Sequence, residues 1–288
     1  MTSEVNSACL PMEVTLIQMW LHDKSPNSRR SYLRDVTDFL SFIQKPLGEV
    51  TLIDIQNWDT QLKLKYAPSS QKRKITAVRS LFAFAMDNEI LDKNPSAKLK
   101  PPKFKDAIAE RLLTEDEWEK MLLAEPKRQH QLMLAFLYET RARVSEFCSL
   151  TWKDLREKPD GSALITLFGK GNKTRKVTIT PQLWQALKAT KSASTKGDDP
   201  IFLNSRKKAY STVQVWRIVK AAGERVGIYG VSPHWLRHSG ATHQLINGSP
   251  IHLQQQELGH SSLDTTSRYL HLLPGDYGAQ YTKVKLPF

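Results

Sequence analysis

The side chains best suited to chemistry in this sequence are cations and a tyrosine, spread along the chain after residue 140. Arg143 follows a predicted helix break, and Lys170 stands between two glycines. In the stretch SPHWLRHSG, Pro233 suits the first position of a helix, which puts His234 and Arg237 on one face near its positive end. Backbone N–H groups and cations at such an end can hold a phosphate. These residues therefore indicate phosphate binding.

Each of these cations also has a structural interpretation. A turn arginine such as Arg143 can form a buried ion pair with Glu139 or Glu146. Lysines are common in exposed turns, and Lys170 belongs to the segment GKGNKTR, which predicts a hairpin tip where a side chain has little to pack against. No single one of these residues therefore distinguishes phosphate binding from a structural role, and the interpretation depends on their combination.

Tyr269 stands nine positions after His260, among small polar residues and leucines. Leu263 and Leu270 could pack against its ring, so burial in a core is one interpretation. A reactive phenol is the other, and it requires a helix that can move rather than one fixed by packing.

His234 and His238, four residues apart, also have the spacing of a helical zinc pair. However, Trp235 occupies the position at which a metalloprotease of that type has its glutamate base. We therefore prefer the phosphate interpretation and expect neither a metal site nor a cofactor.

The elements that must position these residues begin with a small all-helical bundle over residues 11–100. Four helices are expected: over residues 11–24, from Ser25 with Pro26, from Thr51 with its capping partner Asp54, and from Ser69 or Ser70. Apolar residues at helical spacing predict the inward faces of the second and fourth helices, namely Tyr32, Val36, Phe39, Leu40 and Ile43, and Ile75, Val78, Leu81, Phe82 and Ala85.

The second part of the chain predicts helices around one β-hairpin. An apolar helix over residues 129–139 is interrupted around residues 140–142 and restarts near Arg143. Residues 163–168 and 176–180 favour strands and predict the hairpin. Further helices are expected from Pro181, from Ser211, from Pro233 with Ser232 as its cap, and from Pro250, and a last one includes Tyr269.

A Pro- and Lys-rich connection over residues 94–118 separates the two parts and ends at a capping box of Thr114 with Glu117. We place the domain boundary near Lys105, which gives domains over residues 1–105 and 106–288. The expected fold class is mainly α with a small β-hairpin or sheet in the second domain (α+β).

The chain of 288 residues carries 42 Lys and Arg against 29 Asp and Glu, a formal net charge of +13. Residues 1–105 hold 16 basic and 11 acidic residues (+5), which leaves 26 and 18 (+8) for residues 106–288. So basic a protein often binds a polyanion, and charge in both parts suits a clamp around nucleic acid better than a single basic tail. Solubility alone is the other explanation.

One basic run falls at the start of the fourth predicted helix, where the positive end of the helix dipole disfavours cations. A bound phosphate would reverse that sign. The run and three arginines of the second helix predict a DNA-facing surface, with a merely solvated face as the alternative. Its residues are Lys72, Arg73 and Lys74, with Arg29, Arg30 and Arg34.

The two cysteines, Cys9 and Cys148, lie far apart without metal-ligand spacing. This pattern predicts a reducing compartment and excludes zinc fingers and zinc ribbons. No apolar run reaches the roughly 18 to 20 residues that a membrane span needs, and the N-terminus lacks a signal pattern. We therefore expect a cytoplasmic protein.

The sequence contains an arginine, a hairpin lysine, His-x-x-Arg, Leu-Gly-His and, nine residues later, a tyrosine. This order resembles the tyrosine site-specific recombinases, the family of Xer recombinases and phage integrases. The N-terminal helices, the NPSAKLKPPK linker and LLTEDEW extend the resemblance over about residues 10–272. The resemblance implies a SAM-like core-DNA-binding domain with linker over residues 1–105, and a catalytic domain with a C-terminal tail over residues 106–288.

The resemblance also implies a site-specific DNA recombinase that works through a covalent 3′-phosphotyrosine, for integration, excision or resolution. Tyr269 would attack the phosphorus with His234 as the base, and Lys170 or Lys173 would protonate the leaving 5′-oxygen. Such chemistry keeps the bond energy for religation, so it needs neither metal nor ATP. The implied catalytic residues are Arg143, Lys170, His234, Arg237, His260 and Tyr269, with Glu146 supporting the arginines.

One position departs from the family pattern Thr-Gly-x-Arg, because the chain reads Thr140-Arg141-Ala142-Arg143. An arginine replaces a glycine that could adopt a positive φ. Either the turn differs, or Arg141 itself reaches DNA. The other DNA contacts expected are Arg79, Lys173 and Arg175.

The implied partners are a double-stranded recombination site and further copies of the chain. The copies would form a DNA-bound tetramer in which residues 278–288 of each chain dock on a neighbouring subunit. The sequence leaves open whether accessory proteins take part. Two alternatives remain. One is a type IB topoisomerase-like enzyme that relaxes supercoils without a defined site, and the other is a non-catalytic DNA-binding protein of the same fold. Binding alone does not require Tyr269 or Lys170, which argues against the second alternative.

Overall fold

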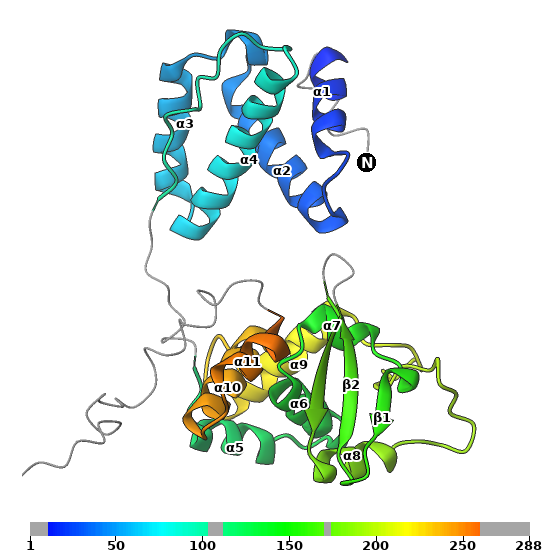
Figure 1. Ribbon diagram of the computed structural model, residues 1–288. Helices are drawn as coiled ribbons and strands as arrows, with labels where there is room; N and C mark the ends of the chain where they lie inside the picture. The colour runs from blue at the N-terminus through cyan, green and yellow to red at the C-terminus, as the bar shows by residue number, and fades with distance from the viewer. Residues whose placement is uncertain (1–10, 103–111, 170–173, 260–288) are drawn as a thin grey trace, which may run out of the picture. The chain divides into compact units, whose positions relative to one another are not determined.

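A computed structural model describes residues 11–102, 112–169 and 174–259 of the chain. The chain divides into two compact units, Met1–Asp106 and Ala107–Phe288 (Figure 1). The boundary that we place near Lys105 lies outside the described residues. The two units are therefore described one at a time.

The first unit is a helical bundle, and its helices begin where their capping residues predict. Ser25 accepts a hydrogen bond from the backbone N–H of Ser28, and Thr51 and Asp54 form a reciprocal capping box. The helices are α1 (Pro11–Leu21), α2 (Pro26–Ile43), α3 (Leu52–Lys65) and α4 (Pro68–Asp87), with a 3-10 turn at Leu47–Glu49.

The predicted inward faces form the core of this unit. Phe39 of α2 is fully buried and meets Trp58 and Phe82 edge to face, with ring centroids 4.9 and 6.1 Å apart. Burying an aromatic or aliphatic side chain of this size contributes roughly 1.5–3 kcal/mol, so these rings stabilise the bundle together with the other buried apolar residues of this unit. Tyr32 differs from its predicted partners, because it is only partly buried and stacks on Trp20.

The start of α4 corrects one expectation. The helix begins at Pro68 with Ala67 as its N-cap, rather than at Ser69 or Ser70. Proline has the fixed φ and the missing N–H that suit the first helical position. Lys72 therefore belongs to the second turn, where the helix dipole disfavours cations less than it does in the first.

The second unit contains helices and one small sheet. Its helices are α5 (Glu115–Leu123), α6 (Arg128–Thr140), α7 (Val144–Ser149), α8 (Pro181–Lys188), α9 (Thr212–Arg225), α10 (Pro233–Ile246) and α11 (Ile251–Leu258). The predicted capping box of Thr114 with Glu117 opens α5, and the predicted helix break falls between α6 and α7. In Figure 1 the sheet lies at one side of α6, α9, α10 and α11.

The sheet is antiparallel, in the order β1 (Leu155–Glu157), β2 (Ala163–Phe168) and β3 (Thr174–Ile179). Strands β2 and β3 form the predicted hairpin, with Ala163 paired to Ile179 and Phe168 to Thr174. Strand β1 was not predicted, because three residues are too few to show a period. The α+β fold class is confirmed.

Within the described parts of the chain, none of the helices combines the length and the apolar character that crossing a membrane would demand.

Candidate active site

The turn before Arg143 is built by Arg141. Helix α6 ends at Thr140, and Arg141 takes the left-handed C-cap position with φ 51° and ψ 30°. The hydroxyl of Thr140 donates to the carbonyl of Phe136 and accepts from the backbone N–H of Ala142. The turn therefore has the form that a glycine would give it, although the left-handed region costs a non-glycine residue roughly 1–2 kcal/mol.

The side chain of Arg141, one of the residues expected to contact DNA, is turned into the protein in this structure. Its side chain is 1 % exposed and forms an ion pair with Glu257 of α11 at 2.6 Å. Burial lowers the pKa of its guanidinium, and the charge of Glu257 acts in the opposite direction.

Arg143 is the N-cap of α7, and its charge is held by Glu146. Its backbone N–H donates to one carboxylate oxygen at 2.7 Å and its guanidinium to the other at 2.9 Å. Of the two partners expected for Arg143, the structure thus selects Glu146, since Glu139 accepts hydrogen bonds from Thr180 instead. The Arg143 side chain is 37 % exposed, so it remains accessible to an anion.

Glu146 is also bound by Arg175 of β3. The Arg175 guanidinium donates to both carboxylate oxygens, at 2.5 and 2.7 Å. Burial opposes the ionisation of Glu146, but the hydrogen bonds and charges of Arg175 and Arg143 outweigh it and lower the pKa of this carboxyl. The Arg175 side chain is 7 % exposed and directed at Glu146, so in this structure it supports that carboxylate, and the DNA contact expected of it stays a prediction.

Arg237 lies in the first half of α10 and is 5 % exposed. Its guanidinium donates to the carbonyl of Arg141 and, at 2.6 Å, to the carbonyl of Leu258. These bonds to two different elements fix the plane of the guanidinium. Helix α10 opens at Pro233 as predicted, but the Ser232 side chain forms no capping hydrogen bond, which corrects its predicted role.

His234 lines a groove of about 400 Å³ together with Val144, the residue that follows Arg143. The groove is bounded by residues at the N-terminal ends of α9 and α10, including Thr212 and Pro233. Positive helix ends favour an anion at this place. The structure thus brings the segments of Arg143 and His234, which are distant in sequence, to one surface groove.

The zinc interpretation gains no third ligand from the described residues. The rings of His234 and His238 lie 6.4 Å apart by their centroids. Among the residues that the structure describes, no group of three or more His, Cys, Asp or Glu side chains could hold a metal ion.

Several predicted site residues lie outside the described residues, namely Lys170, Lys173, His260, Tyr269 and the tail 278–288. The chain leaves α11 at Gly259, which is left-handed with φ 64°. A Cβ added there would lie 3.2 Å from Cδ of Arg175, so the end of α11 adjoins the Arg175–Glu146 pair.

The cations expected to face DNA in the first unit fall into two groups. Lys74 is 3 % exposed and pairs with Asp35 and Asp38 between α2 and α4, and Arg73 also bonds Asp35. Lys74 is therefore buried in this structure rather than exposed on a surface, and its contact with DNA stays a prediction. The others are exposed or half-buried: Arg29, which donates to the last carbonyls of the α1 segment, and Arg30, Arg34, Lys72 and Arg79.

Sequence reasoning missed Gln254 and Glu257. Both lie on α11, where Gln254 is fully buried and Glu257 pairs with Arg141. The signal that could have identified them is the polar run QQQE in a short helix, because a helix with few apolar residues must pack through polar contacts.

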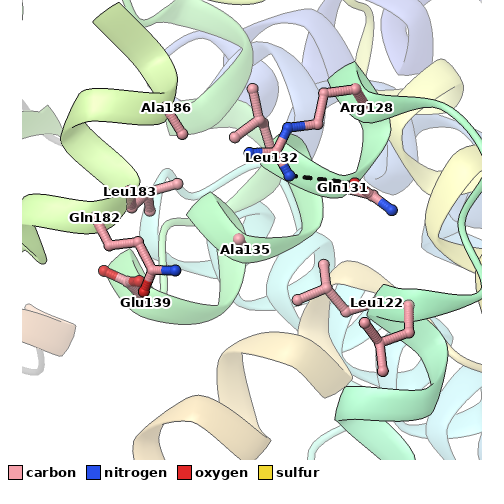
Figure 2. Close-up of a pocket in the computed structure, with 10 residues that line it drawn as sticks. Leu122, Arg128, Gln131, Leu132, Ala135, Glu139, Gln182, Leu183 and Ala186 are labelled. Carbon is pink, nitrogen blue, oxygen red and sulfur yellow. Dashed lines mark hydrogen bonds between the residues drawn. The ribbon is translucent and has the colours of Figure 1, made fainter.

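A second cavity, of about 250 Å³, lies between α5, α6 and α8 (Figure 2). Figure 2 shows mainly aliphatic side chains around it, including Leu132, Ala135 and Leu183, with Arg128 bonded to Gln131 at its rim. Of the predicted catalytic residues that the structure describes, none lines this cavity, whereas His234 lines the other groove.

Comparison with known proteins identifies the family. Residues 111–275 match the model of the phage integrase family, and residues 17–89 match its N-terminal SAM-like domain. The chain belongs to the phage integrase family of tyrosine recombinases. It is 36% identical over 251 residues to a tyrosine recombinase of Pseudothermotoga lettingae, covering 84% of this chain and 86% of that protein. It is 33% identical to tyrosine recombinase XerA of Pyrococcus horikoshii, covering 98% of this chain and 95% of the other.

Solved tyrosine recombinases share the fold. A lambda integrase dimer bound to a COC′ core site has a TM-score of 0.74 at 18% identity, covering 96% of this chain and 98% of that one. The XerH recombinase in a post-cleavage complex with a palindromic difH substrate has a TM-score of 0.73 at 21% identity, covering 93% and 83%. The predicted family is confirmed, and with it the enzyme class, which cleaves and rejoins DNA.

Proposed function

We propose that this chain is a site-specific recombinase whose two units both bind the duplex and whose Tyr269 attacks a backbone phosphate. The single observation that carries the assignment of the site is the arrangement of Arg143. This arginine is anchored by a buried carboxylate, yet it is 37 % exposed and adjoins the groove lined by His234. A cation that is both fixed and accessible is what a developing phosphorane charge requires.

In the proposed reaction the phenolic oxygen of Tyr269 forms a bond to phosphorus while the bond from phosphorus to the 5′-oxygen breaks. His234 takes the phenol proton, and Lys170, or Lys173 in the same loop, gives a proton to the departing 5′-oxygen. The product is a 3′-phosphotyrosine and a free 5′-hydroxyl. Attack of a new 5′-hydroxyl reverses the steps, so the bond energy is retained.

Arg143 and Arg237 bind the non-bridging oxygens, whose negative charge grows in the transition state. Planar guanidinium groups suit two such oxygens better than ammonium groups do. The fixed plane of Arg237, set by the carbonyls of Arg141 and Leu258, supports this role because preorganised donors need not reorient during the reaction. His260 supplies one more hydrogen bond.

The test is a suicide duplex with a nick beside the cleavage point, so that the short leaving strand diffuses away and the covalent adduct persists. We expect an adduct with the unmodified chain, none with Tyr269→Phe, and no effect of EDTA. Because the target sequence has to be known, the substrate is first selected from a pool of duplexes by binding to the same chain.

A relaxation assay separates the proposal from the topoisomerase alternative. Relaxation of supercoiled plasmids that lack the selected site, at the rate seen with the site, would favour the topoisomerase. Binding of the selected duplex with no adduct would favour a non-catalytic DNA-binding protein.

We also propose that copies of the chain assemble on DNA as a tetramer in the cytoplasm, with residues 278–288 docked on a neighbouring subunit. Two XerH structures and the lambda integrase dimer are complexes with DNA sites, which supports a DNA-bound oligomer. Deleting residues 278–288 should leave the binding of one subunit to a half-site intact and reduce the assembly of paired sites in gel-shift experiments. Unchanged assembly would contradict the tail's role.

A further inference from the structure

The C-terminal end of α11 is held by arginines from three other elements. Arg141, at the end of α6, donates to the carboxylate of Glu257 at 2.6 Å and to the side chain of Gln254 at 3.3 Å. Arg175 of β3 donates to the carbonyl of Glu257 at 2.5 Å, and Arg237 of α10 donates to the carbonyl of Leu258 at 2.6 Å. Helix α11 thus ends in contact with the same residues that form the candidate active site.

Arg141 is a costly residue for its position. Glycine adopts a left-handed C-cap without steric penalty. Arg141 carries two costs in free energy, one from its left-handed backbone and one from the burial of a charged side chain that is 1 % exposed. Its Nε has no hydrogen-bond partner among the described residues. Forming the turn does not require a buried guanidinium, so we infer that the Arg141 side chain has a role that glycine could not fill.

The contacts of Arg141 indicate what this role is. The backbone carbonyl of Arg141 binds Arg237, its chain continues through Ala142 to Arg143, and its side chain binds α11 through Glu257. One residue therefore connects both phosphate-binding arginines with the helix from which the chain runs to His260 and Tyr269.

We propose that Arg141 and Glu257 form a positioning pair that sets the direction in which the chain leaves α11 toward His260 and Tyr269. The two side chains are 1 % and 15 % exposed and bind each other, so the proposed role is positioning rather than contact with DNA. The inference rests on the proposed function, because it matters only if Tyr269 is the nucleophile. A misplacement of about 1 Å in a reacting group can cost about 100-fold in rate, so a pair remote from the phosphate can control cleavage.

The test measures single-turnover adduct formation at saturating enzyme, and separately the affinity for the intact duplex at several salt concentrations. Arg141→Gly keeps the turn and removes the guanidinium, and Glu257→Gln removes the opposite charge. We expect each variant to cleave about 10-fold more slowly or worse, with duplex affinity and its salt dependence unchanged. The double variant should be no slower than the slower single variant, because both changes remove one interaction.

Two further variants separate positioning from bulk packing. Arg141→Lys, which keeps the cation, should recover part of the lost rate, whereas Arg141→Met, which keeps only the volume, should not. Lys207→Gly is the matched control, because Lys207 is also a cation at a left-handed position (φ 55°) but is exposed in a loop. It should cleave at the unmodified rate.

The outcomes distinguish the explanations. Weaker duplex binding and a shallower salt dependence in Arg141→Gly, with Glu257→Gln unaffected, would make Arg141 a DNA contact and overturn the inference. Unmodified cleavage rates in both single variants would also overturn it. Failure of the unmodified chain to form any adduct would instead reject the proposed function, and this inference with it. If Arg141→Gly does not fold, Glu257→Gln and Arg141→Lys carry the same comparison.

Discussion

At the scale of single residues, the described part of the site combines buried supporting side chains with the exposed guanidinium of Arg143. Glu146 is 1 % exposed on its side chain and binds both Arg143 and Arg175, whereas Arg143 is 37 % exposed. A buried carboxylate that has two arginine partners fixes their geometry, and the arginine at the surface is the one proposed to bind the phosphate. The buried Arg175 neutralises the charge of the Glu146 carboxylate inside the protein.

Replacing either of the two arginines proposed to bind phosphate should reduce DNA cleavage without weakening DNA binding. Arg143→Ala and Arg237→Ala should each retain duplex binding and lose about 10²-fold or more in the rate of adduct formation, because a partner of the transition-state charge is lost. The exposed Arg156 of β1 offers a matched control, and Arg156→Ala should cleave normally. A similar loss in all three variants would point to general electrostatics rather than to a defined site.

Three of the cations expected at DNA share one property in the structure. Arg141, Lys74 and Arg175 were expected at DNA, yet each is buried beside a carboxylate. The acidic partner of Arg141 is 116 positions away and that of Arg175 is 29 positions away. Local spacing cannot reveal such partners, so a sequence pattern identifies a cation but not whether it faces solvent or a distant carboxylate.

At the scale of elements, local signals predicted the helices well. The capping boxes at Thr51 and Thr114 and the prolines at Pro26, Pro181 and Pro233 mark helix starts in the structure. These signals are reliable because they act within one turn of the chain. Strand β1 was missed because its three residues are defined by pairing with β2, which is a tertiary contact.

Helix packing holds the arginine turn, and Gly240 of α10 is the place to test it. A Cβ at Gly240 would lie 2.4 Å from the carbonyl oxygen of Tyr138 in α6, and backbone cannot move aside as a side chain can. Gly240→Ala should therefore destabilise the second unit by roughly 1–3 kcal/mol. Thermal unfolding of the full chain, followed at the transition of that unit, measures the effect.

Gly197→Ala provides the comparison, because its added Cβ would make an ordinary contact of 3.5 Å with the Lys153 side chain. It should leave the unfolding temperature nearly unchanged. Equal stability of the two variants would contradict the close approach of α10 to α6.

At the scale of the whole molecule, charge is the property that both units share. Residues 1–105 carry a net charge of +5 and residues 106–288 carry +8, as the difference between basic and acidic residues. Condensed counterions are released when cations meet DNA phosphates, so each contact contributes to affinity and to its salt dependence. This charge distribution supports the proposal that both units bind the duplex.

The exposed arginines of α2 test whether the first unit contributes to DNA binding. The variant with Arg30→Ala and Arg34→Ala should bind duplex DNA more weakly and reduce the slope of log affinity against log salt by about two units. Lys63→Ala on α3 is the control, because Lys63 is exposed but already paired with Asp59 at 2.6 Å. An unchanged salt slope in the double variant would place the DNA-binding face elsewhere.

The central claim, that the Tyr269 phenol becomes joined to DNA, is tested most directly by locating the covalent bond in the trapped adduct. Trypsin cuts after Arg268 and Lys283, so the peptide of residues 269–283 carries Tyr269, Tyr277 and Tyr281, and fragmentation by mass spectrometry distinguishes them. The account predicts a nucleotide 3′-phosphate on Tyr269, and unchanged adduct yields with Tyr277→Phe and Tyr281→Phe. A nucleotide on another residue, or an adduct that persists in Tyr269→Phe, would contradict it.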